Sequence, residues 1–130
     1  MLYRRLDDPF GVANSELLLG HAVADEGDFA LAQDLFEASA RGFQEIGDDH
    51  YTLAATRLAA WTYDELGDRA HSRSLYELVV RRAREAHNKR MEAMSLGPLA
   101  EYALDDGHIQ EAGLMLARST RLLRDVGDRS

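Results

Sequence analysis

Apolar residues recur along the chain at spacings of three, four and seven residues, the period of an amphipathic helix. Leu31, Leu35 and Phe36, followed by Phe43 and Ile46, show this spacing plainly. Six such intervals of about 20 residues follow one another, and none contains a run of alternating β-branched residues. The pattern therefore predicts six helices and no strand.

Short turn signals separate the six intervals and repeat with a period of 40 residues. Glycine adopts the left-handed conformation that ends a helix at little cost, and a following Asp can accept the first N–H groups of the next helix. Each dipeptide thus ends one helix and begins another. The turn signals are Gly27–Asp28, Gly67–Asp68 and Gly107–His108 in one series, and Gly47–Asp48, His87–Asn88 and Gly127–Asp128 in the other.

Turns this short force consecutive helices to run antiparallel, which gives three helical hairpins. A hairpin of this length cannot bury both of its apolar faces alone, so stacking of the hairpins must form the core. We expect an all-α fold, an α-α superhelix (solenoid) of three antiparallel helical hairpins. The expected parts are an N-terminal segment, 1–13, and a repeat domain, 14–130, with repeats at about 14–48, 51–88 and 91–128.

Two columns of small residues recur where the helices of a hairpin approach closely, and a large residue follows the second column in each repeat. This arrangement resembles the tetratricopeptide (TPR) pattern, W-x2-L-G-x2-Y, then A-x3-F, then proline. The resemblance covers about residues 14–128. The columns are Gly20, Ala60 and Ala100, then Ala32, Ser72 and Ala112, with Phe36, Tyr76 and Leu116 as the large residues.

The chain departs from the TPR pattern at the closing proline, where it has Gln44, Arg84 and Arg124. Its unit is 40 rather than 34 residues long, so it is similar to the longer TPR units of kinesin light chains and of the sensor regions of large bacterial transcription activators. HEAT and armadillo hairpins share the period, but the Gly–Asp turns and the small-residue columns favour TPR.

Three places in the sequence break the regular pattern. Pro98 falls inside the first helix of the third repeat, where we expect a break or kink near residues 95–97, or a helix that starts late. By the same period, residues 1–6 align with the end of an earlier second helix. The last helix offers Met115, Leu122, Leu123 and Val126 to no following helix, which favours either a fragment of a longer array or a homodimer through its ends.

Composition limits the function classes. The 130 residues are 45% hydrophobic and 29% charged, which is ordinary for a globular domain. The net charge of -8 is the wrong sign for binding nucleic acid through its phosphates. No apolar stretch is long enough to span a membrane and no signal-peptide core is present, so we expect a cytoplasmic protein. Fourteen Arg against one Lys, with abundant Ala, are typical of a GC-rich bacterial genome.

The sequence carries no catalytic or cofactor motif. Without cysteine, disulfides and thiolate zinc sites are impossible, and no two of the five histidines are spaced i,i+4 on one helix. No H-E-x-x-H, nucleophile elbow, P-loop or G-x-G-x-x-G occurs. We therefore expect no enzyme activity, no cofactor and no metal.

The resemblance implies that the first helix of each TPR repeat lines a concave groove. Trp61 is of special interest because TPR repeats have their tryptophan five positions earlier, where this chain has Thr56. A tryptophan beside Arg57 is typical of a binding hot spot. The alternative is that Trp61 shields a neighbouring helix. The implied groove residues are Asn14, Leu17, His21, Asp25, Arg57, Trp61, Asp64, Glu65, Met94, Glu101 and Asp105.

Chaperone-binding TPR grooves carry several basic and amide side chains, and here only Arg57 and Asn14 qualify. We therefore expect a basic or amphipathic protein or peptide as partner, held by a non-enzymatic scaffold that belongs to a larger bacterial regulator. The alternative is a sensor domain of a transcription activator that binds a small ligand or a signal peptide.

Overall fold

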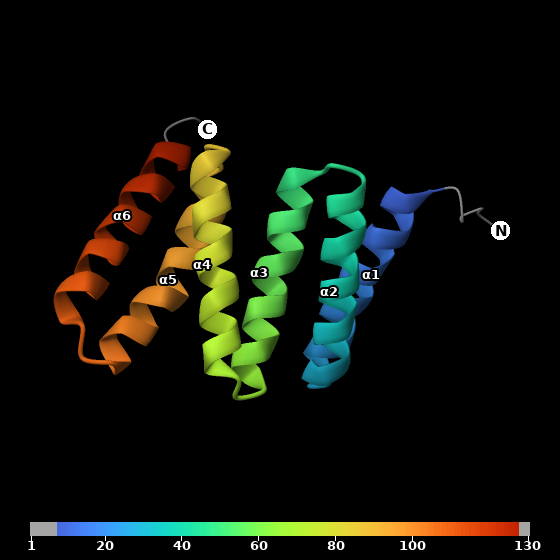
Figure 1. The fold of residues 1–130 in the computed structure, drawn as a ribbon, viewed down its shortest axis with the longest axis horizontal. Coiled ribbons are helices and arrows are strands. Elements are labelled where there is room, and N and C mark those ends of the chain that lie inside the picture. The colour runs from blue at the N-terminus through green and yellow to red at the C-terminus, as the bar shows by residue number, and fades with distance from the viewer. Residues whose placement is uncertain (1–7, 128–130) are drawn as a thin grey trace. The chain divides into compact units, whose positions relative to one another are not determined.

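The computed structural model describes residues 8–127, and these form six α-helices and no strand (Figure 1). The predicted all-α class and the number of helices are confirmed. Residues 1–6, expected to end an earlier helix, lie outside the described part. The helices are α1 (Pro9–Asp25), α2 (Phe29–Glu45), α3 (Asp49–Glu65), α4 (Arg69–Glu85), α5 (Lys89–Asp105) and α6 (Ile109–Gly127).

The five turns between these helices occur every 20 residues, as the sequence predicts, and each has one residue with positive φ. Gly27, Gly47, Gly67 and Gly107 have φ values from 79° to 89°. The turn between α4 and α5 instead has His87 at φ 57°, in the left-handed region, where residues other than glycine are strained. The period therefore locates this turn even where glycine is missing.

The turn after α1 shows how two residues serve two helices. The backbone N–H of Gly27 donates to Ala24 O at 2.9 Å and that of Asp28 to Val23 O at 3.0 Å, which closes α1 in a Schellman motif. The carboxylate of Asp28 then accepts from the N–H of Leu31 at 3.1 Å, which caps α2. Asp48, Asp68 and Asn88 cap α3, α4 and α5 in the same way.

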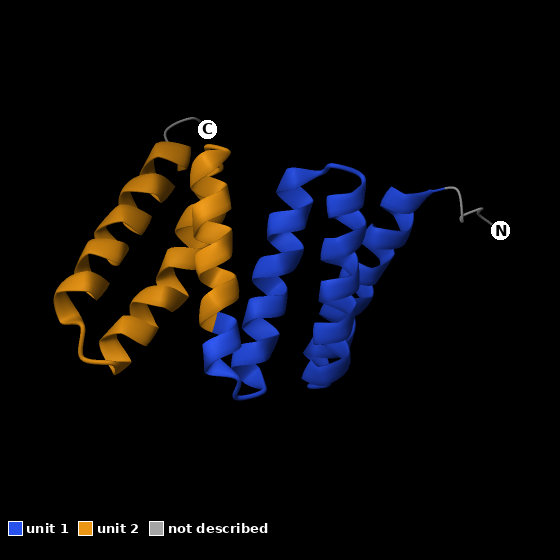
Figure 2. Cartoon of the chain, viewed as in Figure 1, with its two compact units in different colours: residues 1–72 blue, residues 73–130 orange. Residues whose placement is uncertain are grey.

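The chain divides into two compact units (Figure 2). Unit 1 ends at Ser72 and contains α1, α2, α3 and the first turn of α4. Unit 2 begins at Arg73 and contains the rest of α4 with α5 and α6. In unit 1, α2 packs against both α1 and α3, and in unit 2, α5 packs against α6.

Both small-residue columns are buried, as predicted, and so are Phe36 and Tyr76. A Cβ added to Gly20 would lie 2.6 Å from a ring carbon of Phe36, which shows how closely α1 approaches α2. Leu116, the third large residue, is 45% exposed.

The hairpins in the two units share a hydrogen bond from a serine hydroxyl of the second helix to a backbone carbonyl of the first. In unit 1 the hydroxyl of Ser39 donates to Ala13 O at 2.8 Å. In unit 2, exactly 80 residues later, the hydroxyl of Ser119 donates to Ala93 O at 3.0 Å. The equivalence supports two copies of one packing arrangement, in which a second helix is tied to the backbone of the first.

The break and the late start that were expected for the first helix of the third repeat are both absent. α5 runs without a break from Lys89 to Asp105 with Pro98 inside it. Burial of Ser95, Leu96 and Leu99 on both sides of the proline holds the helix, so packing outweighs the missing hydrogen bond.

The exposed apolar residues of α6 also differ from those expected. Leu122 is buried and Met115 packs against the buried alanines 100, 103 and 112. Val126 is half-buried, and of the four residues expected only Leu123 is exposed. The more exposed apolar side chains of α6 are Ile109 and Leu114, at 70% and 74%. The side of α6 that carries Met115 packs against α5 instead.

Candidate functional site

The candidate residues of α3 lie along one face of the helix. Arg57, Trp61 and the pair Asp64 and Glu65 are spaced by three or four residues, so their side chains follow one stripe. Arg57 and Trp61 are half-buried, whereas the two acidic residues are exposed. The stripe therefore runs from an apolar and basic middle to an acidic end.

Trp61 is held by an aromatic neighbour. Its ring lies 5.5 Å from that of Phe29, at the start of α2, with the planes at 90°. Such edge-to-face pairs stabilise a defined ring orientation. Phe29 therefore holds one side of the Trp61 ring, and part of the ring remains exposed to solvent.

The candidate residues of α1 are spaced in the same way but differ in burial. Asn14 is half-buried, and His21 and Asp25 are exposed. The ring of His21 lies 5.4 Å from that of Phe36. Leu17 is only 8% exposed and belongs to the core of unit 1, so it cannot offer much surface to a partner.

The remaining candidates, Met94, Glu101 and Asp105, are exposed on α5 in unit 2. Each unit thus presents its own helix faces, and a groove shared by all three repeats stays a prediction.

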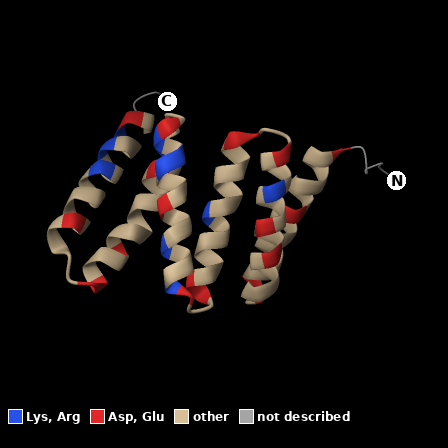
Figure 3. Cartoon of the chain, in the orientation of Figure 1, with Lys and Arg blue, Asp and Glu red and all other residues tan. Residues whose placement is uncertain are grey.

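Charge is divided very unevenly between the units (Figure 3). Residues 8–72 contain thirteen Asp and Glu against three Arg, a net charge of −10, with His neutral. Residues 73–127 contain eight acidic and nine basic residues, a net charge of +1. The α1 and α3 faces therefore lie on a unit that attracts cations.

A buried tyrosine anchors α3 beneath its exposed stripe. The hydroxyl of Tyr63 donates to Glu37 Oε2 of α2 at 2.7 Å, and its ring stacks on His71 at 3.9 Å. Burial, with the hydrogen bond to Glu37, raises the pKa of Tyr63 to about 12. Tyr63 is 8% exposed, so it supports the stripe rather than forming part of it.

The family model for the tetratricopeptide repeat matches residues 11–85, more than half of the chain. The chain belongs to the tetratricopeptide repeat family. The match extends from the start of α1 to the end of α4. TPR repeats generally mediate protein–protein interactions, so a scaffold that binds protein partners is supported. No curated protein and no solved structure matches the chain.

Two further observations concern residues 8–127. They contain no group of three or more His, Asp and Glu side chains placed to hold a metal ion. No helix in this part of the TPR chain is long and apolar enough to cross a membrane.

Sequence reasoning missed one polar cluster in unit 2. Glu92 of α5 is 3% exposed, and its Oε2 accepts from Nε of Arg84 at 3.0 Å and from Nε of Arg118 at 2.5 Å. Burial raises the pKa of Glu92, but the hydrogen bonds from Arg118 and Arg84 outweigh it and lower the pKa. No motif marks this cluster.

The spacing within the cluster could have revealed it. Arg118 and Glu92 are 26 residues apart, as are Ser119 and Ala93 in the same hairpin. A 26-residue offset therefore pairs α6 with α5, and the equivalent positions in unit 1, Ala38 and Val12, carry no charge.

Proposed function

We propose that this TPR chain is a non-enzymatic scaffold whose Trp61 face binds a basic or amphipathic peptide. The Trp61 face comprises Arg57, Trp61, Asp64 and Glu65 of α3. The observation that carries the proposal is the half-buried tryptophan, steadied by Phe29 and followed by two exposed carboxylates.

The Trp61 face combines the features of a binding hot spot. A large aromatic surface that is already oriented loses little side-chain entropy when a partner covers it. A Lys or Arg of the peptide gains from lying over the indole and near Asp64 and Glu65. The net charge of −10 on residues 8–72 attracts such a partner from solution.

The α1 face extends the proposed surface within unit 1, where Asn14, His21 and Asp25 contribute further polar groups for the peptide. The three candidates on α5, Met94, Glu101 and Asp105, belong to unit 2 and stay a sequence prediction. Leu17 is left out because it is buried.

The only tryptophan in the sequence provides its own reporter. An array of basic, acidic and neutral amphipathic peptides is screened against the intact chain, and hits are titrated by tryptophan fluorescence and by calorimetry. Basic peptides are expected to bind, and Trp61→Ala to weaken them by at least about tenfold. The matched control is Leu19→Ala, since Leu19 is 52% exposed on another helix.

The proposal fails if Trp61→Ala binds as tightly as the native chain while retaining its helical circular dichroism. It also fails if acidic peptides bind as well as basic ones.

The bacterial and cytoplasmic setting, the larger regulator and the homodimer remain sequence predictions. Sedimentation of the intact chain over a range of concentrations tests the homodimer directly. The sensor alternative gains some support from an apolar groove in unit 2.

A further inference from the structure

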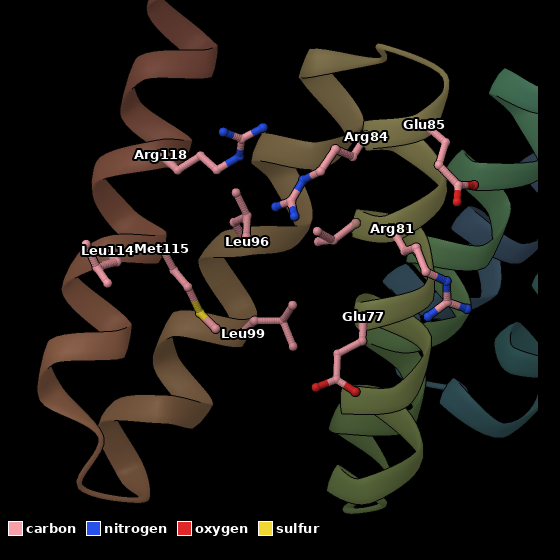
Figure 4. A pocket seen from close by; sticks show the side chains of 10 residues that line it. Glu77, Arg81, Arg84, Glu85, Leu96, Leu99, Leu114, Met115 and Arg118 are labelled. Carbon is pink, nitrogen blue, oxygen red and sulfur yellow. The ribbon is translucent and has the colours of Figure 1, made fainter.

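Unit 2 contains an apolar groove of about 680 Å³ between α4 and α6, with α5 beneath it (Figure 4). Leu96 and Leu99 of α5 line its floor, Val80 lines it from α4, and Leu114 and Met115 line it from α6. Leu114 is 74% exposed, so a large apolar side chain borders the opening. All of these residues belong to unit 2.

One end of the groove carries a pair of fixed guanidinium groups. Arg84 reaches from α4 and Arg118 from α6 toward the space beside Leu96 (Figure 4). Glu92 holds both, since its Oε2 accepts from Nε of each. Two positive charges against one carboxylate leave an excess of +1 at this end of the groove.

The guanidinium pair has hydrogen-bonding capacity beyond what Glu92 uses. Each Arg has five N–H donors, while Glu92 engages Nε and Nη2 of Arg84 and Nε of Arg118. The side chains of Arg84 and Arg118 are 54% and 39% exposed, so an anion can approach them from solvent. Their positions are set before a ligand arrives, which lowers the entropic cost of binding.

The size of the groove indicates a small molecule. Its volume lies within the range of roughly 300–1,000 Å³ that is usual for small-ligand pockets. Ten residues line it, whereas a stable protein–protein interface uses roughly 20–30 on each side. Glu77 and Glu85 also line the groove, so its charge is not positive throughout and anion recognition depends on the Arg84–Arg118 end.

We propose that this groove binds an anionic amphiphile of the fatty-acid type. Its carboxylate lies against Arg84 and Arg118, and its hydrocarbon chain lies along Leu96, Leu99, Met115 and Leu114. The site is separate from the Trp61 face, and either site can exist without the other.

The probe is sodium dodecanoate, titrated into the intact chain below its critical micelle concentration and followed by calorimetry. Saturable binding of one molecule per chain is expected. Dodecanol, which has the same chain without the charge, is expected to bind about tenfold more weakly because its hydroxyl forms no ion pair with the guanidinium groups.

Two variants locate the site. Leu114→Glu places a negative charge on the wall of the groove and is expected to reduce dodecanoate affinity by at least about tenfold. Arg84→Gln removes one guanidinium and is expected to reduce dodecanoate affinity but not dodecanol affinity. The control is Leu123→Glu, which alters an exposed leucine of the same helix that does not line the groove.

Several results would overturn the proposal. They are the absence of saturable dodecanoate binding, equal affinity in Leu114→Glu and the native chain, and dodecanol binding as tight as that of dodecanoate. A dimer of the native chain that Leu114→Glu dissociates would show that a second copy covers the groove instead. Loss of peptide binding in Trp61→Ala with dodecanoate binding retained would support two separate sites.

Discussion

Gly20 shows how one missing side chain determines the distance between two helices. The position faces Phe36, which is completely buried, so no neighbouring side chain can move aside easily. Gly113 of α6 has no atom near the position of an added Cβ. Comparing substitutions at the two glycines therefore distinguishes the packing requirement at Gly20 from the general cost of glycine in a helix.

Gly20→Ala is expected to lower the free energy of unfolding by about 1 to 2 kcal/mol, because overpacking outweighs the gain in helix propensity. Gly113→Ala is expected to raise it by about 0.5 to 1 kcal/mol. Urea unfolding followed by circular dichroism measures both. Equal effects of the two substitutions would contradict the close approach at Gly20.

His87 occupies the strained position of its turn. His87→Gly is expected to stabilise the chain by about 1 kcal/mol, since glycine adopts φ near 57° without strain. Gly67→Ala, at the equivalent position of the preceding turn, is expected to destabilise it by a similar amount. The difference in thermal midpoint between the two variants tests the sign of both effects.

The raised pKa of Tyr63 leads us to expect a loss of stability at alkaline pH. Its pKa is raised from 10.0 to about 12, so the stability it contributes is fully present below pH 10 and is lost as the pH rises toward 12. Tyr63→Phe removes this dependence. Absorbance titration at 295 nm should show one fewer phenol ionising near pH 12, and an unchanged titration would contradict the buried hydrogen bond.

Residue positions that repeat were the predictable ones. The six small residues of the two columns are buried as expected, because a 40-residue period imposes the same close contact in each hairpin. Leu17 was expected on the exposed face of α1 but is buried, since a stripe with spacing three and four can include one buried member. The Glu92 cluster occurs in one repeat only, so the 40-residue period does not mark it, and only the 26-residue offset between paired helices could have revealed it.

At the level of elements, helix α5 depends on its partners more than on its own sequence. Gly97 and Pro98 are poor helix formers, yet the helix continues through both. Buried contacts on either side, and Glu92 near its start, connect it to α4 and α6. This is why single-helix reasoning predicted a break where the structure has none.

Glu92→Gln is expected to destabilise the chain by about 1 to 3 kcal/mol at pH 7, because two guanidinium groups lose their shared charged acceptor. The pKa of Glu92 is lowered in the folded state, so its contribution is present above pH 4.5 and is lost as the pH falls through the folded-state pKa. The free energy of unfolding, measured from pH 7 to pH 3, should fall less steeply in Glu92→Gln than in the native chain. A parallel decline in both proteins would contradict the role of the cluster.

At the level of the whole molecule, the charge difference between the units sets the response to salt. Basic-peptide binding to the Trp61 face is expected to weaken by on the order of tenfold between 50 and 500 mM NaCl, because ions screen the field of the acidic unit. Dodecanoate binding should change less, since its hydrocarbon chain supplies most of the contact. Calorimetric titrations at the two salt concentrations compare them, and salt-independent peptide binding would contradict steering by unit 1.

Only three residues separate consecutive helices, and their backbone groups end one helix and begin the next. Inserting or deleting one residue within a helix would rotate everything beyond it by about 100° and carry its apolar side chains away from their partners. Adding or removing a full 40-residue unit would preserve the phase. Lineages of this chain should therefore vary in length by whole repeats rather than by single residues.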